Sequence, residues 1–96
     1  MSVGVNLLFS LIDKAVKSID NNWDIEVLEM HHRHKVDAPS GTAIMLGKAA
    51  ASGKNKKLEN VMKINRTNTI GKNIKNKIVM SSIRKGETIG DHEVIF

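Results

Sequence analysis

Hydrophobic and polar positions follow two different periods near the start of the chain. Between residues 5 and 20, apolar side chains recur at helical spacing, with charged side chains on the opposite side. This spacing predicts an amphipathic helix. Residues 24–30 have the pattern of a strand instead, with Ile25 and Val27 on one face. The chain is therefore expected to open with a helix and then a strand.

A second helix is predicted from its capping residues. Pro39 disfavours a helical conformation at the residue before it, and Ser40 is of a type that caps helix N-termini well. The helix is expected to run from Gly41 to about Ala51, and Ser52–Gly53 is expected to stop it.

Three further segments have the composition of β-strands. They are residues 61–66, 78–84 and 88–96, with a hairpin turn expected at 85–87 and a polar loop at 67–77. A helix, a strand, a helix and then strands is an order typical of the α+β class. We expect two helices on one face of a mixed, mainly antiparallel sheet of about four strands.

Composition limits the size and setting of this fold. The 96 residues suffice for one small domain, and with 41% hydrophobic but only 3% aromatic residues its core must be aliphatic. Cysteine is absent, so disulfides and thiolate metal sites are excluded. The sequence has neither an apolar run of about 20 residues nor a secretory signal pattern. We therefore expect a cytoplasmic location and no membrane partner.

The charge of the chain is positive and uneven. The formal net charge is +5, and between Lys48 and Lys85 there are eleven Lys or Arg residues with Glu59 as the only acid. A nucleic-acid interface would fit such a stretch, but base-stacking aromatics are scarce and no recognition motif is present. A solvated surface explains the charge more simply, so we expect no nucleic-acid partner. A non-catalytic basic binding or assembly module remains the alternative function.

The densest chemistry lies in the stretch EMHHRHKVDAPSGTA, residues 29–43. Its spacing of His32, His34 and Asp37 superficially resembles a zinc ligand set. Arg33 and Lys35 stand among these positions, and two fixed positive charges would repel a divalent cation. We therefore predict no metal.

An anion site with acid catalysis explains the stretch better. A helix N-terminus offers unpaired N–H groups and partial positive charge, which favour a carboxylate or phosphate. Ser40 and Thr42 add hydroxyls, Gly41 allows close approach, and Lys35 adds a full charge. Histidine titrates near neutrality and can deliver a proton. The alternative of an ordinary strand-end histidine stays open, mainly for His34 taken singly.

Residues 31–43, HHRHKVDAPSGTA, closely resemble the signature of the 4-hydroxy-tetrahydrodipicolinate reductase (dihydrodipicolinate reductase) family. Ser2–Asn6 and the glycine-containing stretch Arg84–His92 are also similar to that family. The resemblance implies a reductase of the diaminopimelate route to lysine that uses NADH or NADPH on a cyclic, unsaturated dicarboxylate. It also implies a homotetramer joined through the sheets of this domain.

The resemblance also implies roles for residues of the stretch. His31 matches the family's proton donor and Lys35 its catalytic partner. Substrate binding is implied for His32, Ser40, Gly41 and Thr42, and supporting roles for Arg33, His34 and Asp37, the last as the counter-charge of the basic cluster. For Arg84–His92 we favour a structural explanation, in which the glycines serve turn geometry.

The chain departs from the family pattern in two respects. It has no Gly-rich fingerprint of a dinucleotide-binding domain, and it ends before the family's closing strands. Residues 1–96 are therefore expected to be a substrate-binding and oligomerisation domain, truncated at both ends and without a cofactor site. In addition, Asn73, Asn76 and Val79 replace an expected arginine and two glycines, which leaves the conformation of residues 66–79 open.

Overall fold

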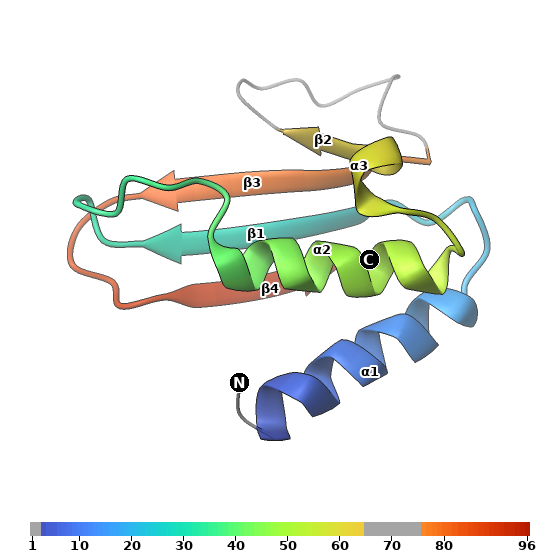
Figure 1. Ribbon diagram of the computed structural model, residues 1–96. Helices are drawn as coiled ribbons and strands as arrows, with labels where there is room; N and C mark the ends of the chain where they lie inside the picture. The colour runs from blue at the N-terminus through green and yellow to red at the C-terminus, as the bar shows by residue number, and fades with distance from the viewer. Residues whose placement is uncertain (1–2, 65–75) are drawn as a thin grey trace.

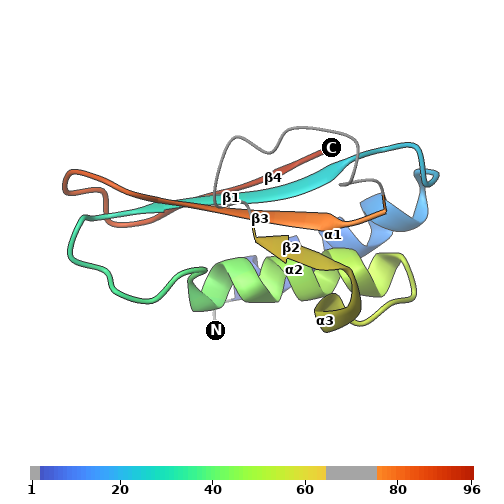
Figure 2. The same cartoon turned by 90° about the horizontal axis from the view of Figure 1, so that it is seen from above.

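The computed structural model describes residues 3–64 and 76–96. Its elements are α1 (Val3–Lys17), β1 (Ile25–His31), α2 (Gly41–Gly53), α3 (Leu58–Val61), β2 (Met62–Ile64), β3 (Ile78–Arg84) and β4 (Asp91–Ile95). The strands form one sheet, and α1 and α2 lie on the same side of it (Figures 1 and 2). No helix within the described ranges is long and apolar enough to cross a membrane.

The sheet is mixed and four-stranded, with the order β2-β3-β1-β4. This confirms the α+β class, with helices on one face of the sheet. The expectation of mainly antiparallel pairing is wrong, because β1–β3 and β2–β3 are parallel and only β1–β4 is antiparallel. The signal lies in β3, whose consecutive buried residues Ile78, Val79 and Met80 form the near-continuous apolar run that is typical of parallel strands.

The predicted hairpin between the last two strands is also wrong. β1 lies between β3 and β4, so the connection passes across the end of β1 (Figure 1). The turn itself is present, and Gly86 adopts a φ of 64° that favours glycine there. Lys85 and Arg33 donate backbone hydrogen bonds to His31 and Gly86, which holds this turn against the end of β1.

Helix boundaries differ from the predicted ones by a few residues. α1 ends at Lys17 instead of residue 20. α2 continues through Ser52–Gly53 and is followed by Asn55 with a φ of 58°. Gly53 serves the packing of α1 on α2, because a Cβ there would lie 2.6 Å from the Cβ of Val16.

The strand expected at residues 61–66 begins one residue later, since α3 occupies Leu58–Val61 and β2 spans Met62–Ile64; residues 65 and 66 lie outside the described residues. The predicted loop at 67–77 lies mainly outside the described residues, as does Asn73. Asn76 is described and has a φ of 65°. Val79, which replaces an expected glycine, lies in β3 and is buried.

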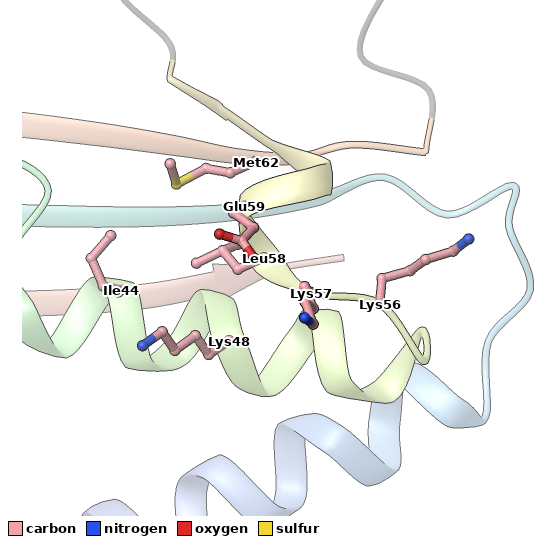
Figure 3. Close-up of a pocket in the computed structure, with 7 residues that line it drawn as sticks. All are labelled: Ile44, Lys48, Lys56, Lys57, Leu58, Glu59 and Met62. Carbon is pink, nitrogen blue, oxygen red and sulfur yellow. The ribbon is translucent and has the colours of Figure 1, made fainter.

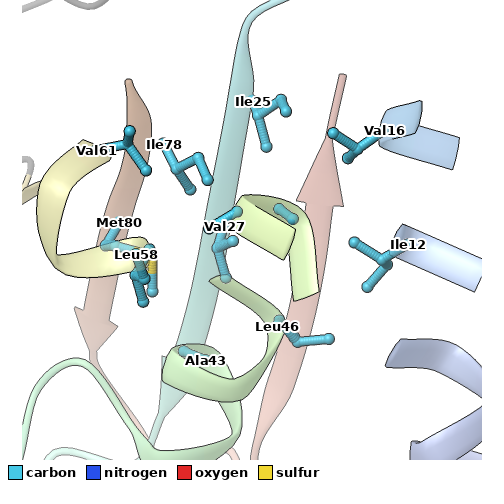
Figure 4. Packing of buried hydrophobic residues seen from close by; sticks show 12 residues of the cluster. Ile12, Val16, Ile25, Val27, Ala43, Leu46, Leu58, Val61, Ile78 and Met80 are labelled. Carbon is cyan, nitrogen blue, oxygen red and sulfur yellow. The ribbon is translucent and has the colours of Figure 1, made fainter. Parts of the chain in front are cut away.

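The core is aliphatic, as predicted, and lies between the sheet and α2. Ile25 and Val27 of β1 and Ile78 and Met80 of β3 face the helices and are at most 1% exposed. They pack with α2, α3 and α1, as Figure 4 shows; the partners include Ala43, Leu46, Leu58, Val61, Ile12 and Val16. This core occupies the end of the sheet where β1 and β3 begin. The opposite end of the same face is polar.

Candidate functional site

The candidate site lies at the end of the sheet where β1 and β3 finish and α2 begins (Figure 1). Side chains alternate along a strand, so Glu29 and His31 continue the buried face begun by Ile25 and Val27. Strand register places Arg84 beside His31 and His92 beside Glu29. The polar end, as we call this region, comprises Glu29, His31, Ser40, Arg84 and His92, together with loop residues 32–39 and the first turn of α2.

Glu29 is the centre of the polar end and is only 1% exposed. Its carboxylate accepts hydrogen bonds from both terminal nitrogens of Arg84 and, at 2.8 Å, from the backbone N–H of Ser40. Its Oε1 also lies 3.4 Å from Nδ1 of His31. Burial alone would raise the pKa of Glu29, but the hydrogen bonds from Arg84, Ser40 and His31 outweigh it and lower the pKa to about 2. Glu29 is therefore ionised at neutral pH.

Arg84 connects the sheet to the loop before α2. Besides Glu29, its Nη2 donates to the carbonyl oxygen of Asp37 at 2.6 Å. The hydrogen bond to Glu29 raises the pKa of the guanidinium further above its ordinary value. Arg84 is thus a fixed cation that anchors the loop at Asp37.

Two histidine rings meet beside this ion pair. The rings of His31 and His92 are 5.1 Å apart and nearly perpendicular, and Nε2 of His92 lies 3.1 Å from Oγ of Ser40. Burial lowers the pKa of His92, and the charges of His31 and Lys35 lower it further, against the opposing effect of Glu29. His92 is therefore held in its neutral form at the start of α2.

Ser40 is the N-cap of α2, as predicted, and its Oγ accepts from the N–H of Ala43 at 3.2 Å. Ser40 itself is 2% exposed, whereas Gly41 and Thr42 are exposed. A Cβ on Gly41 would meet no atom within 4 Å. Within the part of the chain that the structure describes, the N–H groups of Gly41 and Thr42 have no protein acceptor. The helix start is therefore open to an anion.

The remaining predicted residues lie in the loop between β1 and α2. Lys35 forms an ion pair with Asp37, with Nζ and Oδ1 3.0 Å apart. The hydrogen bond from Lys35 lowers the pKa of Asp37. Nδ1 of His32 accepts the backbone N–H of His34 at 3.2 Å, and the side chains of Arg33 and His34 are exposed. Among the described residues, no group of His, Asp or Glu could hold a metal ion.

Sequence reasoning missed three residues of the polar end. The sequence predicts Glu29 only as part of a strand, and it predicts only a structural role for Arg84 and His92. The strand period was a usable signal, because Glu29 falls on the face of Ile25 and Val27, and a charge on a buried face needs a partner. That the partner is Arg84, 55 residues away, follows only from strand pairing.

A separate pocket lies beside α2, α3 and β2 (Figure 3). This pocket of about 500 Å³ is lined by Ile44, Lys48, Lys56, Lys57, Leu58, Glu59 and Met62. Its lysines could attract an anion, but its lining has no histidine to transfer a proton at neutral pH. The polar end combines cations, open N–H groups and imidazoles, so it is the stronger candidate for chemistry.

The fold defines a class of α+β domain. In this class a buried polar site lies at one end of a mixed sheet. Residues 4–96 match the family described as dihydrodipicolinate reductase, C-terminus. The chain therefore belongs to that family, as its signature indicated.

Curated relatives agree with this membership. The chain is 52% identical to the 4-hydroxy-tetrahydrodipicolinate reductase of Parvibaculum lavamentivorans and 50% identical to that of Dinoroseobacter shibae, in both cases over all of its 96 residues. It spans only 35% and 36% of those proteins, so it corresponds to about a third of their length.

One solved structure supports the fold. The dipicolinate-bound dihydrodipicolinate reductase from Paenisporosarcina sp. TG-14 superposes with a TM-score of 0.68, covering 98% of this chain and 35% of that one. The sequence identity is 23%, so this likeness concerns the fold alone.

Proposed function

We propose that the polar end binds a cyclic dicarboxylate and that the chain is the substrate-binding and catalytic domain of a 4-hydroxy-tetrahydrodipicolinate reductase. Such an enzyme is an oxidoreductase of lysine biosynthesis by the diaminopimelate route. The observation that carries the proposal is the start of α2. Within the described part of the chain, the N–H groups of Gly41 and Thr42 are free to bind an anion, and the backbone N–H of Ser40 donates a hydrogen bond to the carboxylate of Glu29, which holds the helix start in place.

The helix start and the loop before it each contact a different part of the substrate. One carboxylate of the substrate accepts hydrogen bonds from the N–H groups of Gly41 and Thr42, where the partial positive charge of the helix favours an anion. Lys35 exchanges its ion pair with Asp37, which is more than half exposed, for the charge of the substrate. His32, at the beginning of the same loop, is the further substrate contact, and Arg33 and His34 support the loop.

His31 is the proposed proton donor. Its imidazole lies between Glu29 and His92. In its protonated form it gives a proton to the substrate ring as negative charge develops there, and both the positioned acid and the electrostatic stabilisation lower the barrier of the reaction. The nicotinamide of NADH or NADPH supplies the hydride in such an enzyme. The segment from the end of β1 into the first turn of α2 has one glycine, Gly41, rather than a repeated-glycine cradle for a pyrophosphate, so we assign no cofactor contact to this chain.

We further propose that residues 1–96 form an oligomerisation domain and that the parent enzyme is a homotetramer. Ile83 and Ile95, on the sheet face opposite the helices, are 37% and 42% exposed, which supports an interface there. Light scattering of the purified chain tests this. A species larger than the monomer supports the proposal, and a folded monomer at all concentrations contradicts it.

The binding proposal is tested by calorimetric titration with pyridine-2,6-dicarboxylate, the dipicolinate that the related structure contains. Lys35→Ala should weaken binding about 10- to 100-fold, the usual scale for a hydrogen bond to a charged group. Lys48→Ala, which removes an equal charge from the separate pocket, is the matched control and should bind like the wild type. A folded wild-type chain that ignores the dicarboxylate but binds DNA in a salt-sensitive way would instead support a basic binding module.

A further inference from the structure

We propose that Glu29 is a positioning residue that serves both halves of the site. It holds one hydrogen of the His31 ring on Nδ1, so that the protonated ring gives up its second proton from Nε2 and returns to the neutral Nδ1–H form. It also anchors the helix start that receives the anion. The naming of His31 as proton donor rests on the proposed function. The hydrogen-bonding role of Glu29 rests on the geometry alone.

The first half of the inference concerns the tautomer of His31. An ionised carboxylate can only accept hydrogen bonds, and Oε1 of Glu29 faces Nδ1 of His31 at 3.4 Å. With Glu29 also receiving Arg84 and Ser40, its charge is well compensated and its protonation at neutral pH is excluded by a pKa of about 2. Nδ1 must then carry the hydrogen whenever the ring is neutral, and Nε2 is the free nitrogen.

Gly90 lies against the Nε2 side of the His31 ring and leaves space for it because it has no side chain. A Cβ at residue 90 would lie 2.9 Å from Nε2 and 3.2 Å from Cδ2 of His31, closer than real contacts allow. The φ of Gly90 is not in the left-handed region, in contrast to that of Gly86. The need for glycine at residue 90 therefore comes from the imidazole rather than from turn geometry. Carboxylate on one side and glycine on the other fix where His31 can point.

The second half of the inference concerns the helix start. Oε2 of Glu29 accepts the N–H of Ser40 at 2.8 Å, and Arg84, bound to the same carboxylate, donates to the carbonyl oxygen of Asp37. Both ends of the segment that leads into α2 are thus tied to one buried group. A displacement of Glu29 would move the anion site and the proton donor together, which couples binding to proton transfer.

A purely structural ion pair between Glu29 and Arg84 is the rival explanation, and the tautomer separates the two. Nitrogen-15 NMR of the labelled chain, above the pH at which His31 is protonated, reports which ring nitrogen carries hydrogen. We expect the Nδ1–H form in the wild type. A predominant Nε2–H form overturns the proposal without any variant.

Glu29→Gln tests the same inference by substitution. One amide oxygen cannot serve the donors of Arg84, Ser40 and His31 together, so we expect the Nδ1–H form to decrease and dipicolinate affinity to fall about tenfold or more. The control is Glu26→Gln, the same change on the other face of β1, where the carboxylate accepts from Ser81 at 2.5 Å. It should change neither readout.

The outcomes separate this inference from the proposed function. An unchanged Nδ1–H form in folded Glu29→Gln overturns the positioning role, whatever the affinity. If Glu29→Gln does not fold, Gly90→Ala replaces it as the test, because the added Cβ would lie against Nε2 of His31. Unchanged nitrogen-15 shifts of the His31 ring in folded Gly90→Ala would contradict the proposed placement of the ring. Failure of the wild type to bind dipicolinate contradicts the proposed function, while the Nδ1–H form would still support the role of Glu29.

Discussion

The two ends of one sheet face share the same strands and the same covering helix, yet they are built on different principles. At one end Ile25, Val27, Ile78 and Met80 bury aliphatic surface against the helices. Two residues further along β1, Glu29 occupies an equally buried position, and its carboxylate accepts hydrogen bonds from Ser40 and Arg84. Burial of apolar area stabilises the first end, whereas the second is stable only as long as every charge keeps its partner.

This comparison separates the part of the fold that holds the domain together from the part that holds a site. A buried ion pair seldom contributes more to folding stability than well-packed hydrophobic residues of the same volume would. The polar end is therefore better explained by chemistry than by folding. Substitutions at the two ends should accordingly differ in kind.

The largest effect on the polar end is expected from breaking the ion pair on one side only. Glu29→Met leaves the half-buried Arg84 without its partner and should lower the free energy of unfolding by about 2–3 kcal/mol, less than the loss for a fully buried pair because water reaches the guanidinium. Adding Arg84→Met should restore most of that loss, since the pair is then replaced by apolar groups. Urea denaturation followed by circular dichroism measures both. A double variant no more stable than the single one would mean that the polar end is itself a stabilising core.

Truncation in the apolar end should act through stability alone. Ile78→Ala, at a fully buried position, should cost about 2–5 kcal/mol, and Ile78→Val about 0.5–1.5 kcal/mol. Dipicolinate affinity of the folded fraction should stay within about twofold of the wild type. A tenfold loss of affinity in folded Ile78→Val would show that the two ends are not independent.

Acid should weaken the polar end selectively. The pKa of Glu29 is lowered from 4.5 to about 2, so its contribution is complete above about pH 4.5 and is lost as the pH falls to about 2. The loss is on the order of 3 kcal/mol, because one pKa unit corresponds to about 1.4 kcal/mol. Unfolding measured across this range should show a shallower pH dependence in Glu29→Gln. Equal slopes in both proteins would contradict the assignment of that pKa to Glu29.

The smallest effect is expected at the helix cap. Ser40→Ala removes the acceptor for the N–H of Ala43 and should lower stability by about 1 kcal/mol. Ser40→Thr keeps a hydroxyl and is the matched comparison. Thermal unfolding of both variants measures the difference. Equal losses would mean that burial at this position, rather than capping, sets its contribution.

The local parts of this structure were predictable from sequence. Helical spacing located α1, and the capping residue located the start of α2. The basic stretch with its Ser-Gly-Thr sequence lies at the end of the sheet where we propose the site. Strand pairing was not predictable, because the parallel contact of β1 with β3 depends on packing between distant segments. For the same reason Glu29 could not be matched with Arg84, nor Gly90 with His31.

The most direct test of the account is a map of dipicolinate binding on the chain by amide chemical shifts. We predict that added dipicolinate shifts the amides of Gly41 and Thr42 most, together with His31 and Lys35, and leaves those of Lys56 and Leu58 in the separate pocket unchanged. Shifts confined to that pocket, or none in a folded protein, would contradict the claim that the polar end is the functional site.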